Sequence, residues 1–258
     1  MPETLKDIAL RVVDNKLVIC VFANKDYLPV LNLWEKYFSK AVKKKFLVFS
    51  FDEETFEFCK EKKYETFFSP YSEKWGLGFM RHMMYLTREI INLNFSILVS
   101  DIDAIWLKDP LEFTTSTNSD LIFSPGTIQP PEAFVEWGNV LCCGYFLIRP
   151  SLRVNKFLDC VEKRMEYEGD QPAINKELLS RNLKWQENGN FYGINFCGHN
   201  VIQSVNSRVG QAGDISVTLL PNRFFQRLQE KEDALVFHPI APKECATKLN
   251  LFKQYGIM

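Results

Sequence analysis

The stretch FSILVSDIDAIWLKDP, residues 95–110, carries the strongest information on the fold class, because a buried strand runs directly into acidic residues there. Residues 95–99 are apolar and rich in β-forming side chains, Asp101 and Asp103 follow one residue apart, and apolar sequence resumes at Ile105. Burying a charged carboxylate is costly unless another group pairs with it. We therefore expect the two aspartates either to meet a cation or to lie at the open end of a strand.

Apolar runs upstream of this stretch predict further strands. Continuous runs at 17–22 and 46–51 have the composition of strands that are covered on both faces. A short third strand is expected at 65–68.

Helical patterns separate the strands. Apolar residues recur at helical spacing within 26–40 and, most clearly, within 79–93. Asp52 is the expected N-cap of a helix over 53–63. This alternating order predicts an α/β fold of the Rossmann-like kind, with a mixed, mostly parallel central sheet flanked by helices. Because ligands bind beyond the carboxyl ends of such strands, the acidic pair falls on the expected binding edge.

The second half of the chain has less regular signals. Strands are expected at 120–124, 140–148, 216–221 and 234–238, and helices over 151–167 and from Asp170 onward. The Pro- and Gly-bearing stretch 125–139 is expected to be a functional loop. Gly144 interrupts an apolar strand, where the backbone must bend or approach another group closely. No repeat, low-complexity tract or linker divides the sequence, so we expect one domain over 1–258.

The overall composition is that of an ordinary globular protein. With 258 residues, a formal net charge of -1 and a pI near 6.4, the chain lacks the clustered positive charge with which proteins bind nucleic acid or anionic membranes. Seven cysteines without regular spacing favour a reducing compartment over a disulfide framework. No apolar run approaches the ~18 residues of a transmembrane helix, and the N-terminal residues lack a signal-peptide core. We expect a soluble, cytoplasmic protein, or a domain of the Golgi lumen if an anchor was removed.

The two aspartates offer ligands for a hard cation. Oxygen ligands suit Mg²⁺ or Mn²⁺, which usually bridge a protein carboxylate to the phosphates of a substrate. The sequence combines an acidic pair at the carboxyl edge of a β-α sheet with the absence of a glycine-rich phosphate loop. This combination suggests a nucleotide diphosphate that is held through a metal ion.

The segment LVSDIDAIWLKDP, residues 98–110, resembles the DxD signature of the nucleotide-diphospho-sugar transferases of the GT-A fold, especially the group with plant rhamnogalacturonan xylosyltransferases and extensin arabinosyltransferases. Further segments match this family in order: CVFANKDY (20–27), the helix and strand of 79–101, CCGYFLIRPS (142–151), GDQPAIN (169–175) and LVFHP (235–239). The resemblance covers roughly Val18 to Lys248, and its specific parts are the DxD segment and GDQPAIN. It implies a glycosyltransferase that moves a sugar from a nucleotide diphosphate donor, a UDP-sugar among relatives, to a glycan or glycoprotein hydroxyl.

The resemblance also assigns roles to individual residues. It makes Asp101, Asp103 and His238 the ligands of a metal ion that acts as a Lewis acid on the departing diphosphate; the imidazole favours Mn²⁺, with Mg²⁺ as the alternative. It assigns donor binding to the following residues: Ala23, Asn24, Arg81, Asp101, Gly144 and Lys248, with Lys243 as the second choice of lysine. The family has a glycine between its histidine and its lysine, and HPIAPKECATK (238–248) lacks it. The choice between the two lysines therefore stays open. For Arg81, a solvated helix face is the alternative.

By the same resemblance, Asp170 and Gln171 lie beside the reacting carbon, and the anomeric configuration is retained. In a retaining transfer either residue would steady the oxocarbenium-like transition state; in an inverting transfer Asp170 would deprotonate the acceptor. An ordinary acid in the first turn of a helix is the alternative for Asp170. The nucleotide-sugar-binding half is expected at 17–124, and the acceptor-binding and metal-completing half at 125–258.

Two rival functions belong to other classes. A phosphatase of the haloacid dehalogenase type also places D-x-D after an apolar strand, but it normally has Thr or Val where Ile105 stands and a late acid where Thr218 stands. The other rival is a catalytically silent module that binds a sugar or a nucleotide. Such a module has no need of the acidic metal site that Asp101, Asp103 and His238 offer.

Overall fold

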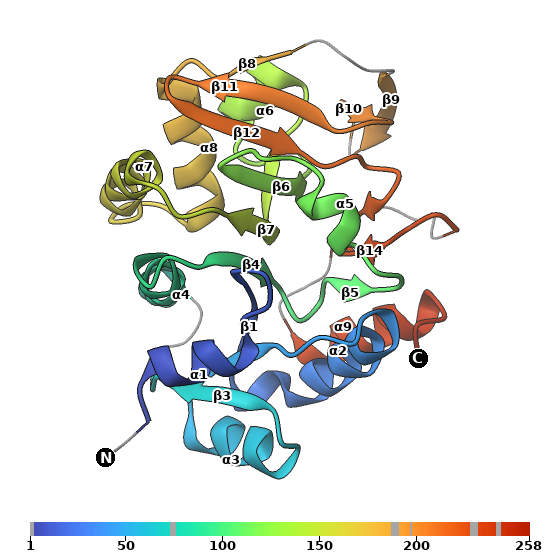
Figure 1. Cartoon of the computed structure of the whole chain (residues 1–258). Helices are drawn as coiled ribbons and strands as arrows, with labels where there is room; N and C mark the ends of the chain where they lie inside the picture. The colour runs from blue at the N-terminus through green and yellow to red at the C-terminus, as the bar shows by residue number, and fades with distance from the viewer. Residues whose placement is uncertain (1–2, 73–75, 187–190, 197, 228–231, 241–243) are drawn as a thin grey trace.

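The structure is a computed structural model, and it describes all residues except 1–2, 73–75, 187–190, 197, 228–231 and 241–243. Within the described residues, a nine-stranded sheet forms the centre of the fold (Figure 1), in the spatial order β3 (Glu65–Phe68), β2 (Leu47–Ser50), β1 (Leu17–Ala23), β4 (Ser96–Ser100), β7 (Leu141–Ile148), β6 (Leu121–Pro125), β12 (Ile215–Leu219), β11 (Arg208–Ala212) and β8 (Lys184–Trp185).

The directions of these strands confirm the expected mixed, mostly parallel sheet. The neighbours from β3 to β4 pair in parallel, as do β6 and β12. In contrast, β7 and β11 are antiparallel to the strands on both of their sides. Seven of the nine strands in the described part of the chain therefore run in one direction.

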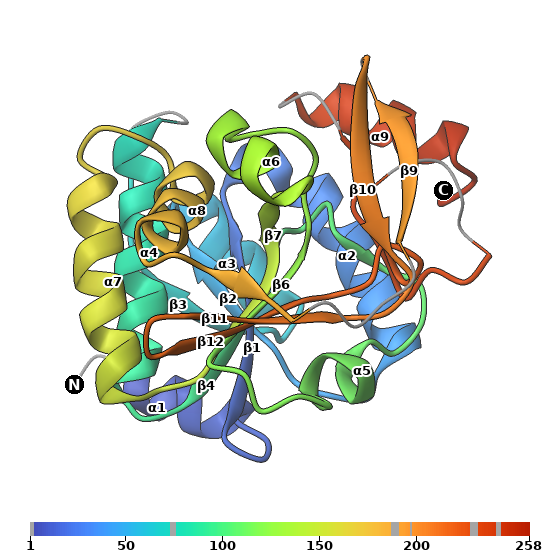
Figure 2. The ribbon, with the colours of Figure 1, turned by 90° about the horizontal axis from the view of Figure 1, so that it is seen from above.

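Helices cover both faces of the sheet. They are α1 (Leu5–Val12), α2 (Leu28–Ala41), α3 (Glu53–Glu61), α4 (Leu77–Asn92), α5 (Leu111–Thr115), α6 (Pro131–Trp137), α7 (Leu152–Arg164), α8 (Asp170–Ser180) and α9 (Cys245–Gln254), with a short 3₁₀ helix, η1, at Lys25–Tyr27. Figure 2 shows α4, α7 and α8 on one side of the sheet and α2 with α9 on the other. In the described ranges, no helix combines the length and the apolar character that crossing a bilayer requires.

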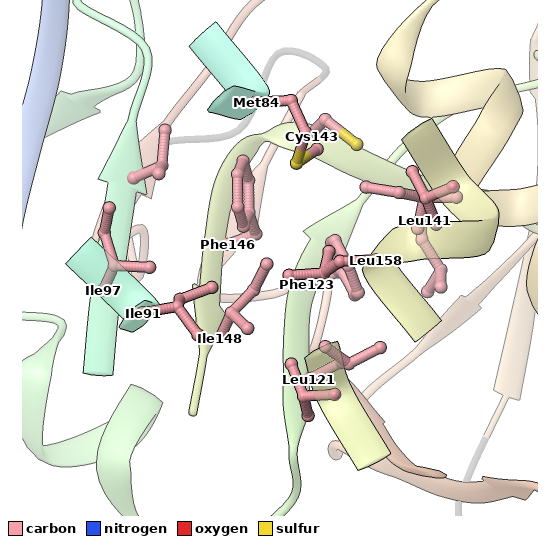
Figure 3. Close-up of a cluster of buried hydrophobic side chains, with 14 of the residues drawn as sticks. Met84, Ile91, Ile97, Leu121, Phe123, Leu141, Cys143, Phe146, Ile148 and Leu158 are labelled. Carbon is pink, nitrogen blue, oxygen red and sulfur yellow. The ribbon is translucent and has the colours of Figure 1, made fainter. Parts of the chain in front are cut away.

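Each face of the sheet has its own apolar core. On the first face, side chains of β4, β6 and β7 pack against α4 and α7, and Figure 3 shows part of this cluster: Met84, Ile91, Ile97, Leu121, Phe123, Leu141, Cys143, Phe146, Ile148 and Leu158. On the second face, Trp34, Phe38 and Trp106 pack with ring centroids 4.8–6.2 Å apart. Burying a side chain of this size contributes about 1.5–3 kcal/mol, so both cores hold the central strands rigidly.

A bulge distorts β7 at Gly144. Its pairing with β6 jumps from Phe146, opposite Phe123, to Cys142, opposite Ser124, so the intervening residues have no partners on β6. Towards β4 the pairing stays regular as far as Ser100 and Tyr145, and the Asp101 N–H then donates to the Gly144 carbonyl at 2.7 Å. The antiparallel strand therefore reaches the acidic turn at the end of β4.

Two smaller sheets complete the described structure. β5 (Ile105–Trp106) pairs with β14 (Val236–Phe237), which in turn pairs with β13 (Phe225–Gln226). The register places Phe237 opposite Ile105, so His238 emerges beside the acidic turn. The second sheet is the hairpin of β9 (Phe191–Phe196) and β10 (His199–Ser204).

Most of the elements expected from the sequence are present, and one expectation was wrong. The stretch 125–139 was expected to be a loop, but it contains the helix α6. Its proline at 131 occupies the first turn, where the missing N–H costs nothing. Gly138 then ends the helix with a left-handed φ of 71°. The Pro and Gly that suggested a loop are thus the start and stop signals of a short helix.

Asp120 ties the start of β6 to its neighbour β12. Its buried carboxylate accepts hydrogen bonds from the Ser216 N–H (2.9 Å) and hydroxyl (2.7 Å), and from the guanidinium of Arg153 (2.8 Å). Burial alone would raise the pKa of Asp120, but Arg153 and Ser216 outweigh it and lower this pKa. The folded protein therefore favours the ionised carboxylate.

We predict that Asp120→Asn lowers the free energy of unfolding by about 2–3 kcal/mol at pH 7, because hydrogen bonds to a charged group contribute about 1.5–3 kcal/mol. Since the pKa is lowered in the folded state, this advantage exists above the unfolded-state pKa of about 3.9 and is lost as the pH falls through the folded-state value. Urea denaturation at several pH values measures it. The exposed Asp214→Asn is the control; equal stability of both variants at pH 7 would contradict this account.

Candidate active site

The acidic turn is anchored by a buried hydroxyl. Ser100, the last residue of β4, accepts indole N–H groups from Trp34 (3.3 Å) and Trp106 (3.1 Å). Its own hydroxyl donates to the carbonyl of Asp101 at 3.1 Å. All three side chains of this cluster are buried. The backbone from which Asp101 and Asp103 project is therefore fixed by hydrogen bonds as well as by packing.

The structure brings the expected metal ligands together. His238 Nε2 lies 3.3 Å from Asp103 Oδ1 and 3.8 Å from Asp101 Oδ2. One ligand atom from each residue can be chosen so that all lie within 4.8 Å of one another. Hard cations bind oxygen at roughly 2.0–2.6 Å, so ligands on opposite sides of one ion are roughly 4–5 Å apart. The spacing and the chemistry of these donors fit a single divalent ion.

Charge is concentrated at this site. Burial and the nearby charge of Asp103 raise the pKa of Asp101. Burial would also raise the pKa of Asp103, but the His238 imidazole and the Lys248 ammonium hold it below its usual range. Asp103 is therefore ionised, as a metal ligand must be.

Lys248, the first choice of the two lysines, contacts Asp103. Its ammonium, on α9, pairs with the Asp103 carboxylate and lies 5.7 Å from the centroid of the Tyr27 ring. Burial lowers the pKa of Lys248, but Asp103 more than compensates, so this pKa is raised and the group stays charged. Lys243 lies outside the described residues.

Gly144 leaves room for the imidazole. A Cβ at this position would lie 2.0 Å from His238 Cε1 and 2.8 Å from Asp101 Oδ2. Contacts this short exclude any side chain unless the ring moves. The close approach expected at Gly144 is thus made by a residue of the chain itself, and the approach of a sugar to this backbone stays a prediction.

One cavity extends from the acidic turn over the end of β1. Ala23 and Asn24 line it together with Tyr27, Ile102 and Lys248. The Asn24 Oδ1 atom is buried and has no hydrogen-bond partner among the described residues. A buried acceptor without a partner is rare in native proteins, so it marks a place where a polar ligand group fits.

A second cavity contains Asp170 and Gln171 on the other side of the acidic pair. Asp170 is the first residue of α8; burial raises its pKa, and its carboxylate accepts the Gln171 N–H at 2.7 Å. The Gln171 side chain accepts the Cys143 N–H at 3.3 Å and donates to the Gln129 carbonyl at 2.7 Å. Asp170 therefore faces the cavity, while the amide of Gln171 fastens the strand bearing Gly144.

The structure does not bring Arg81 into these cavities. Met80 and Met83 line the cavities around the acidic pair, whereas Arg81 is exposed and lines a separate hollow with His82 and Tyr85. Successive residues of an α-helix are rotated by about 100°, so a residue next to Met80 points to another face. This position agrees with the alternative of a solvated helix face.

Two neighbours of the imidazole were missed by the sequence patterns. Arg227 Nη1 lies 2.8 Å from His238 Nδ1 and 2.8 Å from Cys142 Sγ. Cys142 stands in a pair of adjacent cysteines without metal-binding spacing, and Arg227 follows β13 in an unremarkable polar stretch. Only the fold joins them to the histidine, and no local pattern signals this.

Comparison with known proteins settles the family. The nucleotide-diphospho-sugar transferase family matches residues 41–247, which include the acidic pair, Asp170 and His238. The chain belongs to this family. The expectation drawn from the DxD segment and its companion motifs is thereby confirmed.

Relatives of this nucleotide-diphospho-sugar transferase are distant. The beta-arabinofuranosyltransferase RAY1 of Arabidopsis thaliana is 24% identical over 174 residues, which are 62% of this chain and 32% of that protein. The chain thus spans about a third of the length of this curated relative.

A solved glycosyltransferase structure shares this fold. The glycosyltransferase GlyE of Streptococcus pneumoniae TIGR4 has a TM-score of 0.50 at 12% identity over 93% of this chain and 64% of its own. A galactosyltransferase, LgtC, solved with donor and acceptor sugar analogs, has a TM-score of 0.49 at 12% identity over 92% and 95% of the two chains. The likeness to GlyE agrees with the GT-A fold expected from the sequence.

Proposed function

We propose that this protein is a metal-dependent glycosyltransferase that moves a sugar from a nucleotide diphosphate donor, a UDP-sugar, to a glycan or glycoprotein hydroxyl. The observation that carries the proposal is the meeting of Asp101, Asp103 and His238 at the carboxyl edge of the sheet. Membership of the nucleotide-diphospho-sugar transferase family supports the donor class. This family membership also weighs against the phosphatase. In addition, Thr218, which stands where the phosphatase has its late acid, forms a hydrogen bond with the Ser119 hydroxyl.

Asp101, Asp103 and His238 would hold the metal ion, and Mn²⁺ is our choice because two oxygens and one imidazole suit it better than Mg²⁺. A bound ion supplies Lewis-acid stabilisation of the charge that develops on the departing diphosphate. Lys248 adds a second positive charge next to Asp103. Its ammonium would pair with a diphosphate oxygen.

The donor nucleoside would occupy the cavity over the end of β1. Ala23 and Asn24 line it, and the unpartnered Asn24 Oδ1 is a hydrogen-bond acceptor for the base or ribose. Asp101 lies between this cavity and the one that contains Asp170, because it lines both. The diphosphate would therefore span the acidic turn, with the sugar on the side of Asp170.

Asp170 and Gln171 would act at the reacting carbon. The Gln171 side chain is held by Cys143 and Gln129, and its backbone N–H donates to the Asp170 carboxylate, so we assign Gln171 a role in orienting that carboxylate. In a transfer with retention, which we propose, this carboxylate stabilises positive charge on the sugar. The division expected from the sequence belongs to the proposal: residues 17–124 bind the donor, and 125–258 bind the acceptor and complete the metal site.

A ligand-dependent melting experiment tests this proposal. A ligand that binds only the folded state, at 100 times its Kd, adds about 2.7 kcal/mol of stability, which raises the Tm of a chain of this size by about 5–10 °C. We expect this shift with UDP plus Mn²⁺ and a much smaller one with UDP plus EDTA. Equal shifts with and without Mn²⁺ would refute a metal-dependent donor site.

Turnover separates the rival functions. Mn²⁺-dependent hydrolysis of a UDP-sugar, with release of UDP, supports the transferase. Hydrolysis of p-nitrophenyl phosphate without donor turnover supports the phosphatase. Binding of UDP with Mn²⁺ but no turnover of any nucleotide sugar, with a panel of glycan acceptors present, supports the silent binding module.

A further inference from the structure

The two nitrogens of the His238 ring face different surroundings. Nε2 faces Asp103 at 3.3 Å and Asp101 at 3.8 Å. Nδ1 faces Arg227 Nη1 at 2.8 Å and Cys142 Sγ at 3.8 Å. The ring is mostly buried, so the hydrogen-bond partners of both nitrogens are provided by the protein.

Arg227 and a metal ion place opposite demands on this ring. A guanidinium only donates hydrogen bonds, so Nδ1 is the acceptor in this structure and the ring hydrogen is on Nε2, directed at Asp103. Ligation of an ion through Nε2 requires the neutral ring to carry its hydrogen on Nδ1 instead. Two donors would then face each other at 2.8 Å. The Arg227 contact and metal ligation through Nε2 therefore exclude each other.

The surroundings of Arg227 show how the conflict can be resolved. Its Nε is buried without a hydrogen-bond partner among the described residues, so its contacts here are incomplete. Its side chain lines the same cavity as Lys248 and Asp170. The Cys142 sulfur already lies near Nδ1 and accepts the Gly144 N–H at 3.4 Å. An acceptor for an Nδ1 hydrogen is thus in place once the guanidinium moves.

We propose that Arg227 is displaced from His238 when a divalent ion binds, and that its guanidinium then pairs with the diphosphate of the donor while Cys142 becomes the acceptor that orients the ring. Arg227 is in this scheme a donor-binding residue whose availability depends on the metal, and Cys142 is a positioning residue. Both parts rest on the proposed function: the competition for the imidazole needs only its metal ion, and the diphosphate part needs its donor as well.

Two calorimetric titrations of Arg227→Met test the displacement. Mn²⁺ titrated alone should bind about 3–10-fold more tightly than to the unaltered protein, because the competing contact is gone. UDP titrated at saturating Mn²⁺ should bind about tenfold more weakly, because a charge-assisted hydrogen bond is lost. Arg223→Met is the matched control, since Arg223 lies four residues upstream and forms an exposed ion pair with Asp233; it should change neither affinity.

The sulfur is tested in the same way. Cys142→Ala removes the acceptor and should weaken Mn²⁺ binding about 10-fold, in the range found for residues that orient a ligand. Cys142→Ser retains an acceptor and should restore most of the affinity. Loss of affinity in both cysteine variants would show that packing, not acceptance of a hydrogen bond, is what matters, and would overturn the role of Cys142.

The outcomes separate the two proposals. Mn²⁺ binding that Arg227→Met leaves unchanged or weakens would overturn the displacement while leaving the transferase proposal standing. A second outcome is that Arg227→Met binds Mn²⁺ more tightly, while the unaltered protein does not bind UDP at all. This result would support the competition for His238 but refute both the diphosphate role and the proposed donor. Failure of the unaltered protein to bind Mn²⁺ would overturn both.

Discussion

Asp103→Ala is expected to lower the Mn²⁺-dependent hydrolysis of a UDP-sugar by about a thousandfold. The substitution removes a proposed metal ligand and the partner of Lys248 at the same time. Lewis-acid stabilisation of a leaving diphosphate contributes several kcal/mol, and a thousandfold loss corresponds to about 4 kcal/mol. Release of UDP, measured with and without Mn²⁺ for both proteins, gives the result.

The fold of this variant should persist. Asp103 lies in a turn after β4, and its removal relieves the repulsion of Asp101 while leaving Lys248 without its partner, so the effects on stability oppose each other. Circular dichroism melting should place both proteins within a few degrees. Asp109→Ala changes an exposed aspartate of the same segment and should keep full activity. Unimpaired turnover by Asp103→Ala would remove the basis of the metal assignment.

Gly144→Ala should weaken Mn²⁺ binding about 10–100-fold, as changes that misplace a metal ligand commonly do. The reason is steric: the new methyl group would lie 2.0 Å from His238 Cε1 and 2.6 Å from Nδ1, so the imidazole must leave its position beside Asp103. The φ angle of Gly144 is not in the left-handed region, so the backbone itself accepts alanine. Calorimetric titration of Mn²⁺ measures the effect.

A double-mutant cycle shows whether the methyl group acts through the imidazole. His238→Ala removes the ring, and Gly144→Ala in that background should then have little further effect on the Kd for Mn²⁺. If Gly144→Ala weakens binding equally with and without the ring, then the substitution distorts Asp101 or β7 instead. In that case the absence of a side chain at Gly144 is not what allows His238 to bind the ion.

The sequence was most informative where structure is decided locally. The strands β1, β2 and β4 coincide with continuous apolar runs. The helix capped by Asp52 follows from one side chain that accepts the Thr55 N–H at 2.8 Å. Their order then sets the parallel sheet and places the acidic pair at its binding edge. Each step needs only neighbouring residues, which is why these predictions were confirmed.

The second half was harder to predict because its elements depend on distant partners. β11 and β12 are short, and no alternation of apolar and polar residues predicts that they pair. The helix α6 was read as a loop, although proline in its first turn and a left-handed glycine after it are regular boundaries of a helix. Tertiary contacts decide such short segments more than local preference does.

The candidate site shows the same limit. The acidic pair is visible in one short stretch, whereas His238 and Lys248 were assigned only through resemblance to a family. The contact of Lys248 with Asp103 spans 145 residues, and that of Arg227 with Cys142 spans 85. Residues so far apart share no periodicity, and no motif signals their contact. His238 reaches the acidic turn through a similarly distant contact, the pairing of β5 with β14.

This pairing of β5 with β14 has a consequence for biosynthesis. Lys248 leaves the ribosome 145 residues after Asp103, which at typical rates of translation is a delay of roughly 7–29 s. A nascent chain therefore carries the acidic turn for that time without the ammonium that pairs with Asp103. Under the proposed function, the protein would consume nucleotide sugar only after β14 and α9 have docked, so synthesis itself would delay the onset of activity.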